Sequence, residues 1–204
     1  MLHDEHDDDA RPMPAPDDAG EPAEVRLVER IVAGDLRAFE RLYRGYHGRL
    51  TRFLDRMMRR RTLVEEVLND TMLTVWNRSD RYNGTSKVST WIFAIAYRKA
   101  LKALHRLDDA VEAQEDGDGD PATSHANGPE GHLERREVRA QLGRALDALS
   151  HDHRVVVELT YFHGMGYREI AQIVDCPVDT VKTRMFHARR RLRGLLAGEA
   201  EDWL

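Results

Sequence analysis

The sequence predicts an all-α protein of two small helical domains joined by a flexible acidic linker, the second of them a helix-turn-helix domain. Three observations support this fold class. Apolar residues recur at steps of three and four over residues 24–107 and 133–198. The intervening residues 108–132 are acidic, interrupted by Gly and Pro, and show no periodicity. Residues 166–196 contain two helical patterns separated by a tight turn, and no segment is typical of a strand.

Charge is distributed unevenly along the 204 residues. The net charge is −5, but residues 1–24 carry nine acids against one base, and residues 108–130 carry eight acids and no base. The remaining residues therefore sum to about +11. Because the regions predicted to fold are basic, the distribution favours a polyanionic partner such as nucleic acid.

The first domain is predicted over residues 24–107, after an acidic tail of 23 residues that is expected to be disordered. Its first helix starts at Val25 and pauses at Gly34, and Asp35 is placed to cap a second helix of about six turns. The basic run 59–61 closes that second helix, where positive charge suits the helix dipole.

Two further helices complete this domain. Thr62 and Glu65 have the spacing of a capping box and are expected to open a third helix, which carries apolar residues as far as Trp76. A polar break over residues 77–87 contains an Asn-Gly turn. A fourth helix is predicted from about Ser89 to Arg106, with one apolar face and a basic outer stripe.

The second domain begins at Leu133 with a helix that carries apolar residues to Leu149, and Ser150 can cap the helix that follows. Two glycines, Gly164 and Gly166, then precede the helix-turn-helix pattern.

The helix-turn-helix pattern comprises a short helix over residues 167–174, a turn over residues 175–177 and a longer helix over residues 178–196. Asp175 occupies a turn position that often needs a left-handed backbone, and Ala171 is small where the two helices must cross. The longer helix has one apolar stripe, formed by Val181, Met185, Ala188, Leu192 and Leu195, and is otherwise basic. This design suits a helix that enters the major groove; a helical hairpin with a solvated basic face is the alternative.

Several other classes are disfavoured by the sequence. The only cysteine is Cys176, so no disulfide can form within the chain and a cytoplasmic location is expected. The acidic N-terminus does not have the pattern of a signal peptide, and no apolar run has the roughly 20 residues of a membrane span. The sequence has no zinc-type Cys/His spacing and no glycine-rich phosphate loop, so neither an enzyme nor a metal or cofactor site is expected.

The order of these pieces resembles the extracytoplasmic-function (ECF) sigma factors, the small two-domain specificity subunits of bacterial RNA polymerase. The segment LVEEVLNDTMLTVWNRSDRYNG is similar to the polymerase-binding segment of that family, and STWIFAIAYRKALKALHR to its promoter-melting segment. In the second domain, DCPV-x-TVK-x-R behind Glu-Ile-Ala resembles the domain that reads the upstream promoter element.

The resemblance implies a transcription initiation factor that directs core RNA polymerase to specific promoters. Residues 24–107 would be sigma region 2, which binds core polymerase and recognises and melts the −10 element, and residues 133–198 would be region 4, which reads the −35 element. The implied partners are promoter DNA, the largest-subunit coiled coil and the flap of core polymerase, and an anti-sigma factor that holds the protein inactive. A stand-alone helix-turn-helix regulator and a sigma mimic without DNA binding are the alternatives, although the basic helix disfavours a mimic.

The resemblance also implies a set of site residues. The −35 element would be contacted by Lys182, Thr183, Arg184, Phe186, His187, Arg190 and Arg191, with the arginines on phosphates; Phe186 could instead pack in the core, and the arginines could be solvated. The −10 element would be held by Asn83, Ser89, Trp91, Tyr97, Arg98, Lys99, Lys102 and Arg106, with Trp91 equally consistent with a core position. Polymerase would be bound through Glu66, Asn69, Asp70, Thr71 and Trp76.

The chain departs from the family pattern at three positions. Many family members have Asn, then Asp or Asn, where this chain has Arg98 and Lys102, so phosphate binding is expected there in place of base contacts. Ser150 stands where Pro is common, which is expected to affect only the start of a helix.

Overall fold

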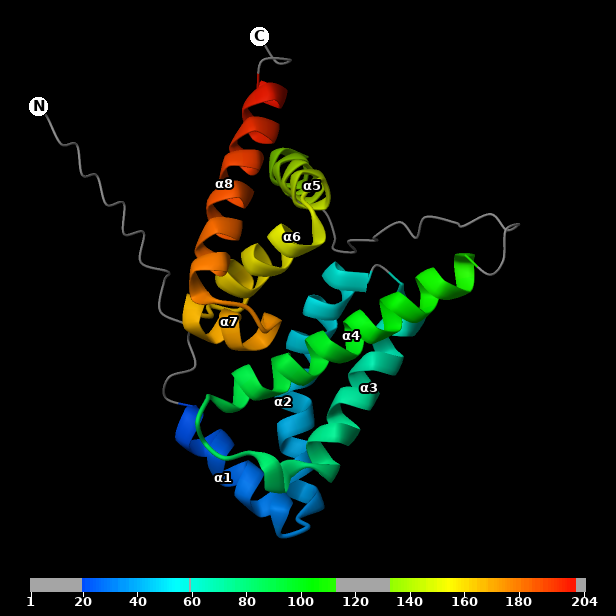
Figure 1. The fold of residues 1–204 in the computed structure, drawn as a ribbon, viewed down its shortest axis with the longest axis vertical. Coiled ribbons are helices and arrows are strands. Elements are labelled where there is room, and N and C mark those ends of the chain that lie inside the picture. Colours follow the sequence, from blue (N-terminus) through cyan, green and yellow to red (C-terminus); the bar gives the residue numbers. More distant parts are fainter. Residues whose placement is uncertain (1–19, 59, 113–132, 201–204) are drawn as a thin grey trace, which may run out of the picture.

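The computed structural model describes residues 20–58, 60–112 and 133–200, and these residues form helices joined by short connections (Figure 1). The first half contains α1 (Glu21–Val32), α2 (Leu36–Met58), α3 (Arg61–Asn77), a short 3-10 turn (Ser79–Arg81) and α4 (Val88–Glu112). The second half contains α5 (Leu133–Asp147), α6 (His151–Val157), α7 (Tyr167–Val174) and α8 (Val178–Ala200). No strand occurs in the described ranges, and the predicted all-α class is confirmed.

Helix α1 begins earlier than the sequence pattern indicated. Residues 21–23 were expected in the disordered tail but form the first turn of α1, where Pro22 is tolerated and Glu21 and Glu24 face the positive end of the helix dipole. The rest of the predicted tail, residues 1–19, lies outside the described residues.

Asp35 caps α2 as predicted. Its Oδ1 accepts the backbone N–H of Arg37 at 2.9 Å and that of Ala38 at 3.1 Å. The guanidinium of Arg30 reaches Oδ2 of the same carboxylate at 2.6 Å, and this hydrogen bond, with the backbone bonds, lowers the pKa of Asp35. Gly34 adopts a φ of +83°, which explains the glycine at the turn between α1 and α2.

The predicted capping box at the start of α3 was wrong. The extended residue before α3 is Arg60, with φ −131° and ψ 106°, and Thr62 is already inside the helix. A capping side chain must stand at the extended position to reach the free N–H groups of the first turn, so Thr62 is placed too late. Glu65 instead lies 3.8 Å from the Nε of Arg61, an exposed pair one turn apart.

Helix α4 extends beyond its predicted end at Arg106 and continues to Glu112. Residues 108–112 were expected in the linker and are helical. The remainder of the predicted linker, residues 113–132, lies outside the described residues.

The buried side chains of the two halves form one continuous core. Leu50 and Phe53 of α2 and Phe93 of α4 are fully buried, and so are Ile170 and Ile173 of α7. Helix α7 lies across α4, which places the helix-turn-helix directly on the helix predicted for promoter melting (Figure 1).

The segment after α6 changes pitch. The Ser150 side chain accepts the N–H of His153 at 3.4 Å and caps α6, as predicted. Residues Glu158–Phe162 then form a π-helical turn. The wider turn rotates Phe162 out of the apolar stripe expected for this helix, and half of its surface is exposed.

The helix-turn-helix has the predicted form. Helix α7 spans the predicted residues, Asp175 adopts the left-handed conformation at φ 54°, and α8 starts at Val178. In α8 the side chains of Val181, Met185 and Ala188 are buried, which fixes the face of this helix that points away from the core.

Candidate nucleic-acid interface

The outward face of α8 carries the side chains predicted to contact base edges. Lys182, Thr183, Phe186 and His187 are all exposed, and 63 % of the Phe186 surface is accessible, so Phe186 does not pack in the core. Its ring stands edge-on to His187 with centroids 5.4 Å apart. Lys182 is held loosely by Asp179, with Nζ 3.0 Å from Oδ1, and the Thr183 hydroxyl donates to the Asp179 carbonyl.

The three arginines predicted for phosphate contacts are in different environments. Arg190 and Arg191 are exposed on α8. Arg184 is half-buried, and its guanidinium lies 2.5 Å from a carboxylate oxygen of Asp152 on α6. Arg184 therefore joins α8 to its supporting helix, whereas Arg190 and Arg191 are available to a phosphate backbone.

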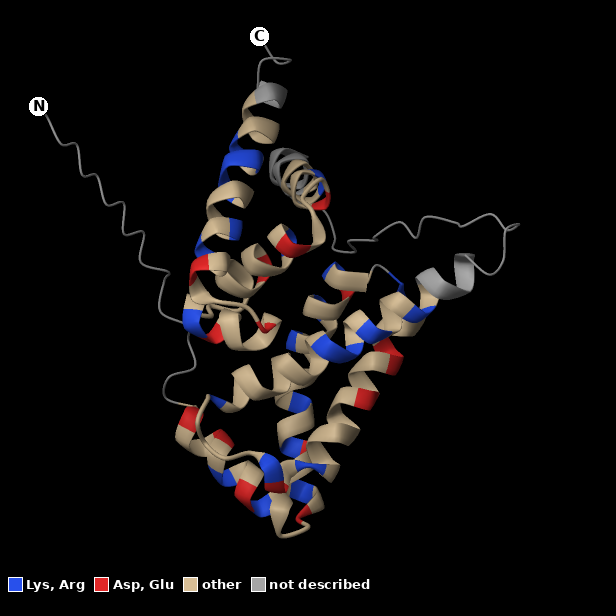
Figure 2. Ribbon diagram, viewed as in Figure 1, with Lys and Arg blue, Asp and Glu red and all other residues tan. Residues whose placement is uncertain are grey.

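A second line of cations runs along α4, and Figure 2 shows basic positions on both α4 and α8. Arg98, Lys102 and Arg106 are exposed at intervals of one turn. Lys99 is partly buried, and its Nζ lies 3.5 Å from Oδ2 of Asp70 on α3. The structure thus brings into contact two residues that were predicted for different partners, DNA and polymerase.

The connection before α4 is ordered by its own side chains. Asn83 accepts the backbone N–H of Thr85 at 3.1 Å and its hydroxyl at 2.7 Å, which shapes the turn at Gly84. The Tyr82 hydroxyl donates to the Ser86 carbonyl at 2.7 Å. Ser89 and Trp91 are half-buried, and the indole of Trp91 packs beside the Tyr82 ring at 5.3 Å. Trp91 thus packs against the core and keeps part of its surface exposed.

Tyr97 does not lie on an open surface. Only 6 % of its surface is exposed, and its ring stacks with His151 of α6 at 6.5 Å between centroids. Burial raises the pKa of the Tyr97 hydroxyl, and burial lowers the pKa of the His151 imidazole. In this arrangement the second half of the chain covers a predicted stacking platform.

The predicted polymerase contacts divide into an outer and an inner group. Glu66, Asn69 and Asp70 are exposed on α3. Thr71, by contrast, is fully buried with its hydroxyl bonded to the Val67 carbonyl, so it faces the core instead of the surface expected for a contact residue. Trp76 also turns inward and packs edge-on against the Phe39 ring at 5.1 Å.

Leu73 belongs with the outer group of α3 and was not singled out from the sequence. More than half of its surface is exposed, three residues after Asp70 on the same helix. The helical period could have identified Leu73 from the sequence. Leu73 lies between the buried positions Met72 and Val75 in the chain, but the period places its side chain away from the apolar stripe of the helix.

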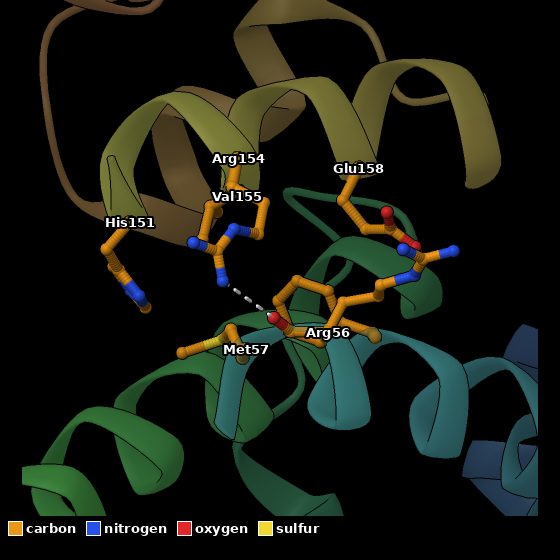
Figure 3. A pocket seen from close by; sticks show the side chains of 7 residues that line it. Arg56, Met57, His151, Arg154, Val155 and Glu158 are labelled. Carbon is orange, nitrogen blue, oxygen red and sulfur yellow. Dashed lines mark hydrogen bonds between the residues drawn. The ribbon is translucent and has the colours of Figure 1, made fainter. Parts of the chain in front are cut away.

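A small hollow lies between α2 and α6 and is lined in part by polar side chains, of which Glu158 is buried. Figure 3 shows Arg56 and Met57 on one side and His151, Arg154 and Glu158 on the other. Burial raises the pKa of Glu158 to about 7, although Arg56 and Arg52 oppose this shift. Among the described residues no cluster of three or more His, Cys, Asp or Glu could hold a metal ion, and no described helix is long and apolar enough to cross a membrane.

Comparison with known proteins agrees with this geometry. Residues 42–109 match the family "Sigma-70 region 2" and residues 139–192 match "Sigma-70, region 4". The ECF RNA polymerase sigma-E factor of Escherichia coli K12 is 32% identical over 174 residues, which cover 81% of this chain and 90% of that protein. The RNA polymerase sigma-H factor of Pseudomonas aeruginosa is 29% identical over 174 residues, covering 82% and 90%.

The chain belongs to the extracytoplasmic-function family of RNA polymerase sigma factors. Two solved structures share its fold at 23% identity. The sigma factor RpoE of Bartonella quintana, solved with the anti-sigma factor NepR, has a TM-score of 0.68 and covers 79% of this chain and 98% of its own. CnrH, solved with the cytosolic domain of CnrY, has a TM-score of 0.64 and covers 86% and 98%.

This sigma factor is therefore a transcription initiation factor and not an enzyme. Its partners are core RNA polymerase and promoter DNA, and the stand-alone regulator is the less supported alternative. The two matched regions fall on the two halves of the structure, with most of α4 inside the region 2 match and α7 and most of α8 inside the region 4 match.

Proposed function

We propose that this sigma factor reads the −35 element with the outward face of α8 and holds the −10 element along α4, while α3 contacts core polymerase. Region 2 would then comprise residues 24–107 and region 4 residues 133–198, joined by the acidic residues 108–132.

The observation that carries the −35 assignment is the exposure of Lys182, Phe186 and His187 on α8, directly opposite the buried Val181, Met185 and Ala188 side chains. Because the opposite face of α8 is buried in the core, the exposed face can enter a major groove without disrupting that packing. Lys182 can donate to guanine acceptors, and Phe186 offers apolar contact to a thymine methyl. Arg190 and Arg191 are exposed on the same helix and suit phosphates.

The −10 assignment is supported by the cations of α4. Arg98, Lys102 and Arg106 repeat at the helical pitch and could follow the backbone of a single strand. The loop from Asn83 to Ser89 would form much of the pocket for an extruded base. Trp91 keeps an exposed portion for stacking, whereas Tyr97 becomes available only if the second half of the chain moves away.

The polymerase assignment is supported by the exposed acidic and polar face of α3, formed by Glu66, Asn69 and Asp70. Leu73 extends this face with an exposed apolar side chain. An exposed leucine beside acids is a suitable anchor for a basic or mixed helix, because the apolar contact adds affinity and the charges set the register.

We further propose an anti-sigma partner and a cytoplasmic location. Both fold relatives were solved in a complex with a second protein, RpoE with the anti-sigma factor NepR and CnrH with the cytosolic domain of CnrY. Core polymerase acts where the chromosome is, which places a sigma factor in the cytoplasm.

Run-off transcription with purified core polymerase tests the −35 assignment. Genomic fragments that include the upstream region of the gene serve as templates, and promoter-specific transcripts are expected only when the sigma factor is present. The double variant Lys182→Ala/His187→Ala should abolish these transcripts, while Arg26→Ala/His47→Ala, at exposed positions of α1 and α2, should retain them. Equal transcription by both variants would overturn the assignment of the reading helix. Tight binding of the isolated protein to duplex DNA without polymerase-dependent transcripts would favour a stand-alone regulator.

A further inference from the structure

Helix α1 contacts the start of the helix assigned above to the −10 element. Oε1 of Glu21, in the first turn of α1, accepts the backbone N–H of Val88 at 2.9 Å. Val88 is the first residue of α4, so its N–H has no partner within that helix. Val88 is fully buried and Glu21 is half-buried, so water has little access to this bond. Glu21 therefore caps α4 from a position 67 residues earlier in the chain.

A second carboxylate fixes α1 to α2. Oε2 of Glu24 accepts the buried Tyr46 hydroxyl at 2.7 Å. Glu24 lies three residues after Glu21 and therefore on the same side of α1. Val28 and Ile31 continue this side of the helix into the core, where both are buried. The position of Glu21 is thus set by the packing of α1 and not by a loose chain end.

The connection between α3 and α4 runs alongside α1 (Figure 1). Within it, the half-buried Tyr82 packs its ring beside Trp91 at 5.3 Å and donates its hydroxyl to the Ser86 carbonyl at 2.7 Å. Burial raises the pKa of the Tyr82 hydroxyl, and the charges of Glu21 and Glu24 raise it further. Helix α1 therefore borders this connection at Tyr82 as well as at the start of α4.

The loop from Asn83 to Ser89 is the part of this connection assigned above to an extruded base. Its own hydrogen bonds, from the Thr85 N–H and hydroxyl to Asn83, shape the turn at Gly84. They do not fix where the loop lies relative to α4. The bond from Glu21 supplies such a tie, because it fixes the residue at which the loop passes into α4. A pocket that is already shaped avoids the ordering cost that a free loop would meet when a base enters.

We propose that Glu21 is a positioning residue for the −10 element, and that its cap on Val88 holds the loop from Asn83 to Ser89 in the shape that receives the extruded base. The inference rests on the proposed role of this loop and of α4 at the −10 element. It adds a helix to that site, because the match to region 2 covers residues 42–109 and α1 ends at Val32.

Hydrogen exchange in the free, full-length protein tests the cap itself. The Val88 amide should exchange about tenfold faster in Glu21→Ala than in the wild type, because its acceptor is removed. Glu29→Ala, at an exposed position of α1, should leave this rate unchanged. Amides of residues 178–190 in α8 serve as the internal reference and should be unchanged in both variants. An unchanged Val88 rate in Glu21→Ala would overturn the proposal.

Promoter opening by the holoenzyme tests the consequence for the −10 element. Permanganate reactivity of thymines in the melted DNA measures opening on an intact promoter and on one with a substituted −10 element. Glu21→Ala should reduce opening of the intact promoter by about fivefold or more and should narrow the difference between the two promoters. Binding to core polymerase, and holoenzyme binding to a duplex with only the −35 element, should not change. Equal losses in all of these quantities would show a general loss of structure and overturn the positioning role.

The conservative variant Glu21→Gln supplies a rescue test. Its amide oxygen can still accept the Val88 N–H, so this variant should retain most of the discrimination between the two promoters. Glu29→Ala should behave as the wild type in every assay. If Glu21→Gln and Glu21→Ala lost discrimination equally, the cap would not be the cause and the proposal would be overturned.

A further variant separates this inference from the proposed function. If Arg98→Ala/Lys102→Ala abolishes opening while Glu21→Ala retains both opening and discrimination, the positioning role alone is overturned. If neither variant affects opening, the −10 role of α4 fails and the inference fails with it.

Discussion

The imidazole of His163 stands edge-on to the Phe93 ring, with centroids 4.8 Å apart and planes at 60°. The two residues come from different halves of the chain, 70 positions apart, and both are buried. Burial, together with the nearby guanidinium groups of Arg49 and Arg52, lowers the pKa of His163 to about 4. The neutral imidazole is therefore the form that packs at this contact.

The first prediction is a loss of stability in mild acid that comes from His163. In the unfolded chain this residue takes up a proton near its ordinary pKa of 6.5, and in the folded chain only near 4. Its contribution to the free energy of unfolding is therefore full above about pH 6.5 and is lost progressively as the pH falls to 4. Urea unfolding at pH 7.5 and 5.0 measures this loss.

The variant His163→Phe isolates that contribution, because it keeps an aromatic ring and removes the titration. We expect its stability to fall less between pH 7.5 and 5.0 than that of the wild type, by about 1 to 2 kcal/mol. His47→Phe, at an exposed position, should retain the wild-type pH dependence. The same pH dependence in wild type and His163→Phe would contradict the prediction.

The second prediction concerns Glu158, which titrates in the opposite sense. Burial raises its pKa to about 7, from an ordinary value of 4.5, so the protonated form is favoured in the folded state. Its contribution to stability is full below about pH 4.5 and is lost as the pH rises through 7. Glu158→Gln should therefore stabilise the protein at pH 8, by on the order of 1 kcal/mol, and have little effect at pH 4.5.

The control for Glu158 is Glu29→Gln, at an exposed position of α1, which should change stability by less than about 0.5 kcal/mol at either pH. Denaturant midpoints at pH 4.5 and 8 provide the comparison. A destabilised Glu158→Gln at pH 8 would show that the carboxylate is held by Arg52 and Arg56 more strongly than burial opposes it.

The third prediction concerns the hydrogen bond between Tyr46 and Glu24. The buried Tyr46 hydroxyl donates to Oε2 of Glu24 at 2.7 Å and links α2 to α1. Tyr46→Phe removes a hydrogen bond to a charged acceptor, so a loss of about 1 to 3 kcal/mol in the free energy of unfolding is expected. Tyr43→Phe removes the more exposed bond to Asn69, at 3.2 Å, and should cost less than about 1 kcal/mol. Thermal unfolding of the two variants side by side measures the difference.

The helix-turn-helix could be predicted closely from the sequence because its constraints are local. The bounds of α7, the left-handed Asp175 and the buried face of α8 follow from spacing within 30 residues. The start of α3 was predicted wrongly. A capping-box pattern identifies residues whose side chains are able to cap a helix, but it does not show which residue adopts the extended conformation just before the helix. That residue is Arg60, which has no capping side chain.

The candidate site was only partly accessible from the sequence, because exposure depends on contacts between distant segments. The helical period places Thr71 on the same face as the buried Val67 and Leu68, and only the family resemblance marked it as a contact residue; its hydroxyl donates to the Val67 carbonyl and the side chain is buried. Tyr97 is covered by His151, and Thr90 contacts Glu169, through packing of the two halves. The helical periodicity within each half does not indicate how the two halves pack on each other. The sequence therefore predicts which face of each helix is apolar, but not that Tyr97 and Thr90 are covered by the second half of the chain.

The last prediction separates base contacts from phosphate contacts on α8. Lys182 is placed on the outward face in the first turns of the helix, whereas Arg191 lies two to three turns further along. Lys182→Ala should weaken binding of the polymerase holoenzyme to its own −35 element by about 1 to 3 kcal/mol and reduce discrimination against a mutated element. Arg191→Ala should weaken binding to both elements alike and lower the slope of log affinity against log salt by about 1.

Titration of the holoenzyme on intact and −35-mutated promoter fragments, at several salt concentrations, measures both quantities. Arg26→Ala, on an exposed face of α1, is the matched control for loss of one surface cation and should change neither. The two variants must differ in kind, because a contact to a base edge carries sequence information and a contact to a phosphate does not. If Lys182→Ala instead weakened both elements equally, Lys182 would be a phosphate contact, and base reading would have to lie with Phe186 and His187.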